Sequence, residues 1–129
     1  MTEVAIDNME RIVKSGPGWR IGWDAQAPEF KGLVGSEQWA LELTEAEFND
    51  FCRLLIQLAE TMSQMSCELM DEEKITCQAE TDLLWMQVEG YPHTYDLQLI
   101  LNTGRRGEGY WLPEAAGALI QAAKILKVF

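Results

Sequence analysis

The chain has 129 residues, of which 47% are hydrophobic, and its formal net charge is −11 from 21 acids and 10 bases. That length fits one domain, and that hydrophobic fraction argues against a disordered chain. A surface this acidic repels, on average, the phosphates of nucleic acids and of anionic membranes. Composition therefore weighs against a function that depends on general attraction to polyanions.

The cysteines indicate the compartment. Cys52, Cys67 and Cys77 form no Cys-x-x-Cys pair, and their odd number fits a reducing cytosol better than a disulfide framework. The chain does not open on a basic and then apolar segment, and its apolar runs are shorter than a membrane span. We therefore expect a cytoplasmic protein that is not held in a membrane.

The first part of the chain predicts strands. Residues 1–8 are expected to be a flexible tail, and Ser15–Gly18 is a predicted turn because Gly and Pro favour chain reversal. Trp19, Ile21 and Trp23 alternate with polar residues or glycine, as in a half-buried strand. The strands predicted here are a short one within Met9–Lys14, then Trp19–Asp24, Phe30–Gly35 and Gln38–Leu43.

The sequence Thr44-Glu45-Ala46-Glu47 has the pattern of a capping box. In this motif the Thr44 hydroxyl accepts a hydrogen bond from the Glu47 N–H, and the Glu47 carboxylate accepts one from the Thr44 N–H. Apolar residues then recur at helical spacing for several turns. We expect a helix that begins at this box and ends between Met65 and Met70.

The second part repeats the order of elements. Asp82–Glu89 is mostly apolar, which is typical of a central strand, and Gly90–Pro92 is a predicted turn. Pro113 suits the first position of a helix, where its missing N–H costs nothing. The strands predicted here are Lys74–Glu80, Asp82–Glu89, Thr94–Leu101 and Glu108–Leu112, followed by a helix to the C-terminus.

Both predicted helices open alike, with Leu43-Thr44-Glu45-Ala46 in one and Leu112-Pro113-Glu114-Ala115 in the other. We therefore predict an α+β fold of two β4α repeats, in which antiparallel sheets pack against two amphipathic helices. Residues 9–129 are expected to form a single domain, with repeat one over about 9–70 and repeat two over about 71–129.

Several segments carry a resemblance to a known family, and they are Gly16–Trp23, Gly32–Gly35, Trp39–Glu47, Glu68–Glu73 and Leu84-Trp85. They resemble the cyanobacterial domain-of-unknown-function family 1818, from about Met9 to the C-terminus. The resemblance implies a cytoplasmic protein of no established activity. The family's fold is similar to that of the single-stranded-DNA-binding transcriptional regulators, including the plant Whirly proteins, which also use a doubled β4α plan.

The sequence shows no standard catalytic motif. It lacks Gly-x-Ser-x-Gly, and its one histidine, His93, follows Pro92 in a predicted turn. The acidic run Asp71-Glu72-Glu73 lacks the spaced ligands of a calcium loop and is interpreted as a solvated loop. We expect no catalytic residue, no metal and no cofactor.

Two groups of residues are candidates for binding. Arg105 and Arg106 lie in a glycine-rich loop that could hold a phosphate or carboxylate, although a charged hairpin tip is the commoner role of such a loop. Trp19 and Trp23, with Arg20 between them, could stack unpaired bases, although core packing is the commoner role of alternating aromatics.

The first predicted helix also carries Leu54 and Ile56 away from its main apolar stripe, and these residues indicate either an interface or deep burial. We therefore predict a non-catalytic binding or assembly domain that recognises a protein partner or itself. One alternative is a single-stranded nucleic-acid-binding, transcription-regulator-like protein. A further alternative is a small-anion binder at Arg105 and Arg106.

Overall fold

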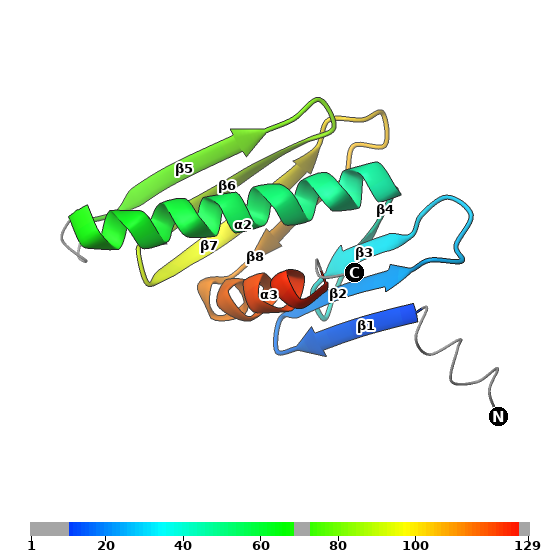
Figure 1. The fold of residues 1–129 in the computed structure, drawn as a ribbon, viewed down its shortest axis with the longest axis horizontal. Helices are drawn as coiled ribbons and strands as arrows, with labels where there is room; N and C mark the ends of the chain where they lie inside the picture. Colours follow the sequence, from blue (N-terminus) through cyan, green and yellow to red (C-terminus); the bar gives the residue numbers. More distant parts are fainter. Residues whose placement is uncertain (1–10, 69–72, 127–129) are drawn as a thin grey trace.

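The computed structural model describes residues 11–68 and 73–126 (Figure 1). The predicted tail, and Asp71 and Glu72 of the acidic run, lie outside the described residues. The first antiparallel sheet, in the order β1-β2-β3-β4, consists of β1 (Arg11–Gly16), β2 (Trp19–Asp24), β3 (Gly32–Gly35) and β4 (Ala40–Leu43). The second, in the order β5-β6-β7-β8, consists of β5 (Ile75–Glu80), β6 (Leu84–Tyr91), β7 (Thr94–Leu101) and β8 (Glu108–Trp111).

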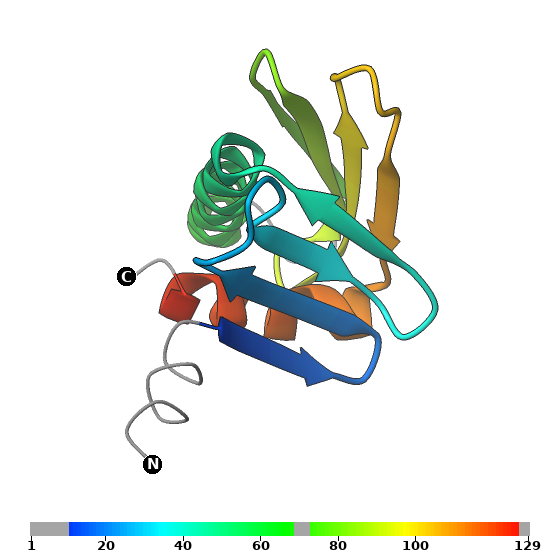
Figure 2. The same cartoon turned by 90° about the vertical axis from the view of Figure 1, so that its right-hand side faces the viewer.

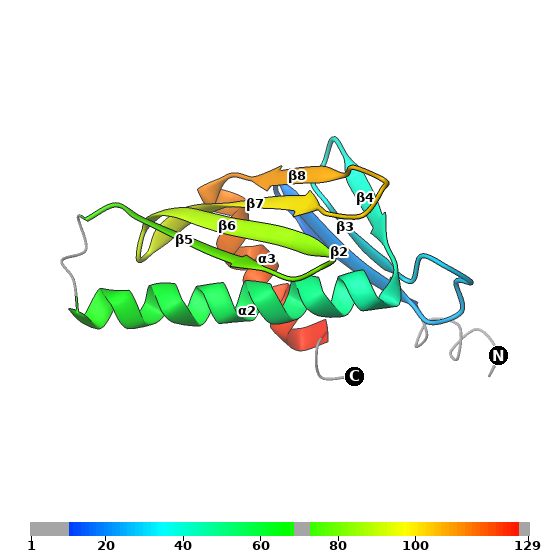
Figure 3. The ribbon, with the colours of Figure 1, turned by 90° about the horizontal axis from the view of Figure 1, so that it is seen from above.

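The helices join the two sheets into one core. Helix α2 (Glu45–Glu68) runs along the second sheet and also contacts β3 and β4 at its beginning (Figure 3). Helix α3 (Pro113–Leu126) packs on β2 of one sheet and on β7 of the other. The strands of the two sheets run in different directions, as Figure 2 shows. The predicted α+β fold with two repeated four-strand units is confirmed.

The core is built from alternate residues of the strands and from the apolar stripes of the helices. Phe51, Leu55, Met86 and Leu99 have no exposed surface. Leu54, which lies off the main stripe of α2, is only 3% exposed, so this part of the helix is buried in its own domain. Of the two roles considered for Leu54, deep burial therefore fits the structure and an open interface does not.

Several predicted boundaries are wrong by a few residues. Strand β1 runs to Gly16, so only residues 17 and 18 of the predicted Ser15–Gly18 turn form it, and β6 begins at Leu84 rather than Asp82. Strand β3 begins at Gly32 rather than Phe30, because Lys31 closes the preceding loop with bonds from its Nζ to two backbone carbonyls, those of Ala25 and Ala27. Strand β4 begins at Ala40 rather than Gln38, and β8 ends at Trp111 rather than Leu112.

The predicted turn at Gly90–Pro92 is displaced. Strand β6 continues through Tyr91, which pairs with Thr94, so residues 92 and 93 make the turn. Gly90 has a φ of 148°, and a Cβ built there would lie 2.6 Å from the carbonyl oxygen of Thr94. The glycine is needed inside the strand for its backbone conformation, which is why its presence wrongly indicated a turn.

The two sheets meet at Trp111, near the end of β8. The Trp111 Nε1–H donates to the carbonyl of Gly35 in β3 over 2.8 Å, and Trp111 is 1% exposed. Its ring lies 5.0 Å, centroid to centroid, from that of Trp39. Trp39 in turn covers Gly109, where a built Cβ would lie 2.5 Å from the Trp39 ring. This tryptophan pair therefore fixes the position of one repeat against the other.

Substitution of Trp111 by Phe is expected to lower the free energy of unfolding by about 2 kcal/mol. The loss arises because the buried Gly35 carbonyl loses its donor, a change that costs about 1–3 kcal/mol, and because a smaller ring fills the site. Urea unfolding followed by circular dichroism measures the change. Trp85→Phe, on the outer face of β6, is the control and is expected to change stability by less than about 0.5 kcal/mol. Equal losses in the two variants would contradict the role given to Trp111.

Candidate functional site

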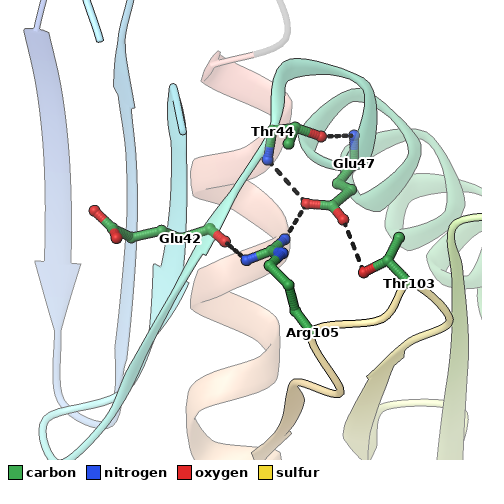
Figure 4. Close-up of polar contacts among 5 residues, drawn as sticks. All are labelled: Glu42, Thr44, Glu47, Thr103 and Arg105. Carbon is green, nitrogen blue, oxygen red and sulfur yellow. Dashed lines mark hydrogen bonds and ion pairs between the residues drawn. The ribbon is translucent and has the colours of Figure 1, made fainter. Parts of the chain in front are cut away.

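The structure gives Arg105 an internal role (Figure 4). Its Nη1 donates to the backbone carbonyl of Glu42 over 2.6 Å, and its Nη2 pairs with the carboxylate of Glu47. Its guanidinium also lies 4.7 Å from the ring centroid of Phe30. Arg105 comes from the loop between β7 and β8, and its partners come from the other repeat. The side chain therefore binds groups of its own chain.

Glu47 is the centre of this cluster and is only 2% exposed. The predicted capping box is present, since Thr44 N donates to Glu47 Oε1 over 2.9 Å and Glu47 N donates to Thr44 Oγ1 over 3.2 Å. Glu47 Oε2 accepts a further bond from the Thr103 hydroxyl over 3.3 Å. A buried carboxylate is stable only when it is paired and hydrogen-bonded in this way. We call Thr44, Glu47, Thr103 and Arg105 the clamp.

Arg106 behaves differently from its neighbour. It is exposed, and among the described residues its side chain has no hydrogen-bonding partner. Its φ of 59° places it in the left-handed region, which an Arg rarely occupies. The structure therefore gives the two arginines different surroundings, with Arg105 bonded to groups of its own chain and Arg106 exposed, and anion binding at this loop stays a prediction.

The predicted stacking residues of β2 lie on two faces of the sheet. Trp19 and Trp23 are half-buried on the helix side, where Trp19 covers Gly16 and the Trp23 ring lies 5.4 Å from that of Phe48. Arg20 points to the opposite face, because successive side chains of a strand alternate. Its Nε donates to the Ser36 carbonyl over 2.7 Å and its Nη2 to the Trp39 carbonyl over 3.1 Å. The structure does not bring Arg20 and the two tryptophans together.

A groove of about 610 Å³ lies beside the junction of the sheets. Three segments distant in the sequence line it, and they are the β1–β2 turn (Pro17-Gly18), the β3–β4 turn (residues 36–39), and the stretch from the end of β8 into α3 (Tyr110, Leu112, Glu114, Ala115). Tyr110 is 48% exposed and Leu112 is 58% exposed, so both present apolar surface at the groove. We call this cavity the junction groove.

The junction groove is negatively charged. The Tyr110 hydroxyl donates to Asp96 Oδ2 over 2.8 Å, and this hydrogen bond raises the pKa of Tyr110 above its usual value of 10. Burial and the charges of Asp96, Glu89 and Glu114 raise the same pKa further. Glu37, another lining residue, accepts a bond from the Gly18 N–H over 3.3 Å. Among the described residues no lysine or arginine belongs to the lining, while Arg20 bonds the backbone carbonyls of two lining residues, Ser36 and Trp39.

The sequence did not indicate Tyr110, Leu112, Glu37 and Glu114, which the structure places in the lining of the groove. One signal was available, because Tyr110-Trp111-Leu112 is an apolar run at the end of a short strand. Alternation along β8 turns Trp111 into the core and leaves Tyr110 outside. The two carboxylates gave no signal, since nothing local distinguishes them from other surface acids.

Other groups offer less chemistry. Within residues 11–68 and 73–126, no cluster of three or more His, Cys, Asp and Glu side chains could hold a metal ion. Cys52 is buried, and the sulfur of the half-buried Cys77 lies 3.9 Å from the sulfur of Met62. His93 is exposed in the β6–β7 turn, and the side chain of Cys67 lies outside the described part. None of the described helices is long and apolar enough to cross a membrane.

Replacement of Arg105 by Gln is expected to lower the free energy of unfolding by about 2 kcal/mol. Breaking a fully buried pair costs about 3–5 kcal/mol, and the cost is smaller here because the Arg105 side chain is 35% exposed. Arg106→Gln, the matched control in the same loop, is expected to change stability by less than about 0.5 kcal/mol. Urea unfolding of both variants makes the comparison, and a larger loss for Arg106→Gln would contradict the assigned roles.

The family model described as domain of unknown function (DUF1818) matches residues 14–126. A solved structure of a protein with unknown function from the DUF155 family of Prochlorococcus sp. NATL2A is similar, with a TM-score of 0.83 and 29% sequence identity. The match covers 89% of this chain and 98% of that chain. Among curated proteins nothing matches.

These comparisons do not show the predicted likeness to the Whirly proteins, which stays a prediction. They do show the family, because the matching model spans most of the chain. The chain belongs to the family of domains of unknown function DUF1818.

Proposed function

We propose that this protein is a non-catalytic binding domain that recognises a segment of a protein partner in the junction groove. The observation that carries the proposal is a 610 Å³ groove with two large, exposed apolar side chains, Tyr110 and Leu112, at its edge. The volume lies in the range of ligand sites, about 300–1,000 Å³. Exposed aromatic side chains beside a concave surface are typical of the residues that dominate binding energy.

The walls of the groove are held in place before any ligand arrives. Trp39 packs on the buried Trp111, and Arg20 binds the carbonyls of Ser36 and Trp39 at the turn that forms one wall. The bond from Gly18 to Glu37 joins the β1–β2 turn to the β3–β4 turn. A site formed in advance loses less conformational entropy on binding, so more of the contact energy contributes to affinity.

The alternative ligands have weaker support. The outer face of the second sheet carries Glu80, Glu89, Asp96 and Glu108 beside Trp85, and these carboxylates would repel the phosphates of a stacked nucleic acid. A small anion has one exposed guanidinium available in the β7–β8 loop, that of Arg106. Self-association would bring together two chains that each carry a net charge of −11.

Selection of peptides from a random hexapeptide display library tests the proposal. We expect selected peptides to bind the wild type, and Leu112→Ser to weaken that binding at least about tenfold, because hot-spot truncation costs 2 kcal/mol or more. Ile125→Ser is the matched control, since Ile125 is 59% exposed on α3 and does not line the groove. Fluorescence anisotropy of labelled peptides measures both variants.

Two results would overturn the proposal. One is equal loss of peptide binding in Leu112→Ser and Ile125→Ser, which would place the binding surface elsewhere. The other is micromolar binding of labelled single-stranded DNA that weakens with salt, which would favour the nucleic-acid alternative.

A further inference from the structure

The charge of the junction groove indicates what kind of segment it receives. Glu37, Glu114 and Tyr110 all line the groove, and the Tyr110 hydroxyl is hydrogen-bonded to a third carboxylate, that of Asp96. Tyr110 and Trp39 also line a neighbouring cavity of about 260 Å³ that contains Glu108. Carboxylates therefore flank the exposed tyrosine in both cavities.

We propose that the junction groove receives a basic side chain, arginine or lysine, that is followed or preceded by an apolar residue in the partner segment. The inference rests on the proposed function and names the chemistry of its ligand. The aliphatic stem of such a side chain would pack on the aromatic rings of Trp39 and Tyr110, and its cationic end would meet the carboxylates of the walls. The apolar neighbour would cover Leu112, which is 58% exposed.

The environment of the Tyr110 hydroxyl supports this charge preference. The Tyr110 hydroxyl donates to Asp96 Oδ2 over 2.8 Å, and this hydrogen bond, together with the charges of Asp96, Glu89 and Glu114, raises the pKa of Tyr110. Carboxylates near this hydroxyl favour a cation over an anion at the same place.

Two other cavities of the described chain differ from this groove in the charge of their lining. The cavity beside β1 and β2 contains Arg11 and Lys31 as well as two carboxylates, so both signs of charge are present. The cavity between α2 and α3 contains Lys124 and no carboxylate among its lining residues. An acidic lining without a cation occurs at the junction groove and its extension past Tyr110.

Three synthetic peptides test the inference by titration with fluorescence anisotropy. They share one pattern, acetyl-Leu-X-Leu-X-amide with a fluorescent label, and X is arginine, glutamine or glutamate. At low ionic strength we expect the arginine peptide to bind at least about tenfold more tightly than the glutamine peptide, and the glutamate peptide to bind weakest. The preference for arginine should shrink as salt screens the carboxylates.

Charge-matched variants locate the effect. Glu37→Gln combined with Glu114→Gln should reduce the arginine preference, measured as the ratio of the two peptides' dissociation constants, to about twofold or less. The control combines Glu29→Gln with Glu60→Gln, which removes the same charge from two exposed positions outside the groove. This control should keep most of the preference.

The outcomes separate the two proposals. If the wild type binds the arginine and glutamine peptides equally, the charge preference is overturned. If Leu112→Ser then loses both peptides, the groove remains the binding site. An arginine preference that falls equally in the two double variants would reflect general attraction to an acidic protein and would overturn this inference. No binding of the arginine peptide at low salt would overturn it as well, whereas the library selection decides the proposed function separately.

Discussion

The carboxylate of Glu47 serves two parts of the fold at once. It closes the capping box that starts α2, and it holds the loop between β7 and β8 through Thr103 and Arg105. Because the group is buried, it requires all of these partners together, and neither repeat supplies them alone. The start of one repeat's helix and the hairpin tip of the other are therefore stabilised by the same charge.

The position of β8 follows from this constraint. The clamp holds the loop that precedes β8, and the bond from Trp111 to Gly35 holds the end of the strand. Between these two points Gly107 and Gly109 let the chain lie close to the first repeat. A Cβ at Gly107 would meet Leu41, and a Cβ at Gly109 would meet Trp39. With both ends and the middle fixed against the first repeat, alternation along the strand leaves Tyr110 facing outward beside the junction groove.

The sequence predicted what depends on near neighbours. Strands Trp19–Asp24 and Thr94–Leu101, the capping box and the order of elements all follow from spacings of a few residues. The ion pair between Glu47 and Arg105 joins positions 58 apart in the sequence, and no local pattern shows which of two adjacent arginines turns inward. The junction groove has the same property, since its lining comes from three segments of the chain, two in the first repeat and one in the second, that only folding brings together.

Net charge illustrates the difference between composition and arrangement. The value of −11 disfavours polyanions wherever they bind, but it gives no location. The structure places the arginines of greatest interest, Arg20 and Arg105, in bonds to carbonyls and to Glu47, so they neutralise or bind groups of their own chain. Carboxylates remain beside exposed apolar surface at the groove, where their field can act on a ligand. An acidic protein with this arrangement would attract a basic partner over distances up to a Debye length, about 8 Å at physiological salt, and its aromatic walls would then contribute the short-range part of the affinity.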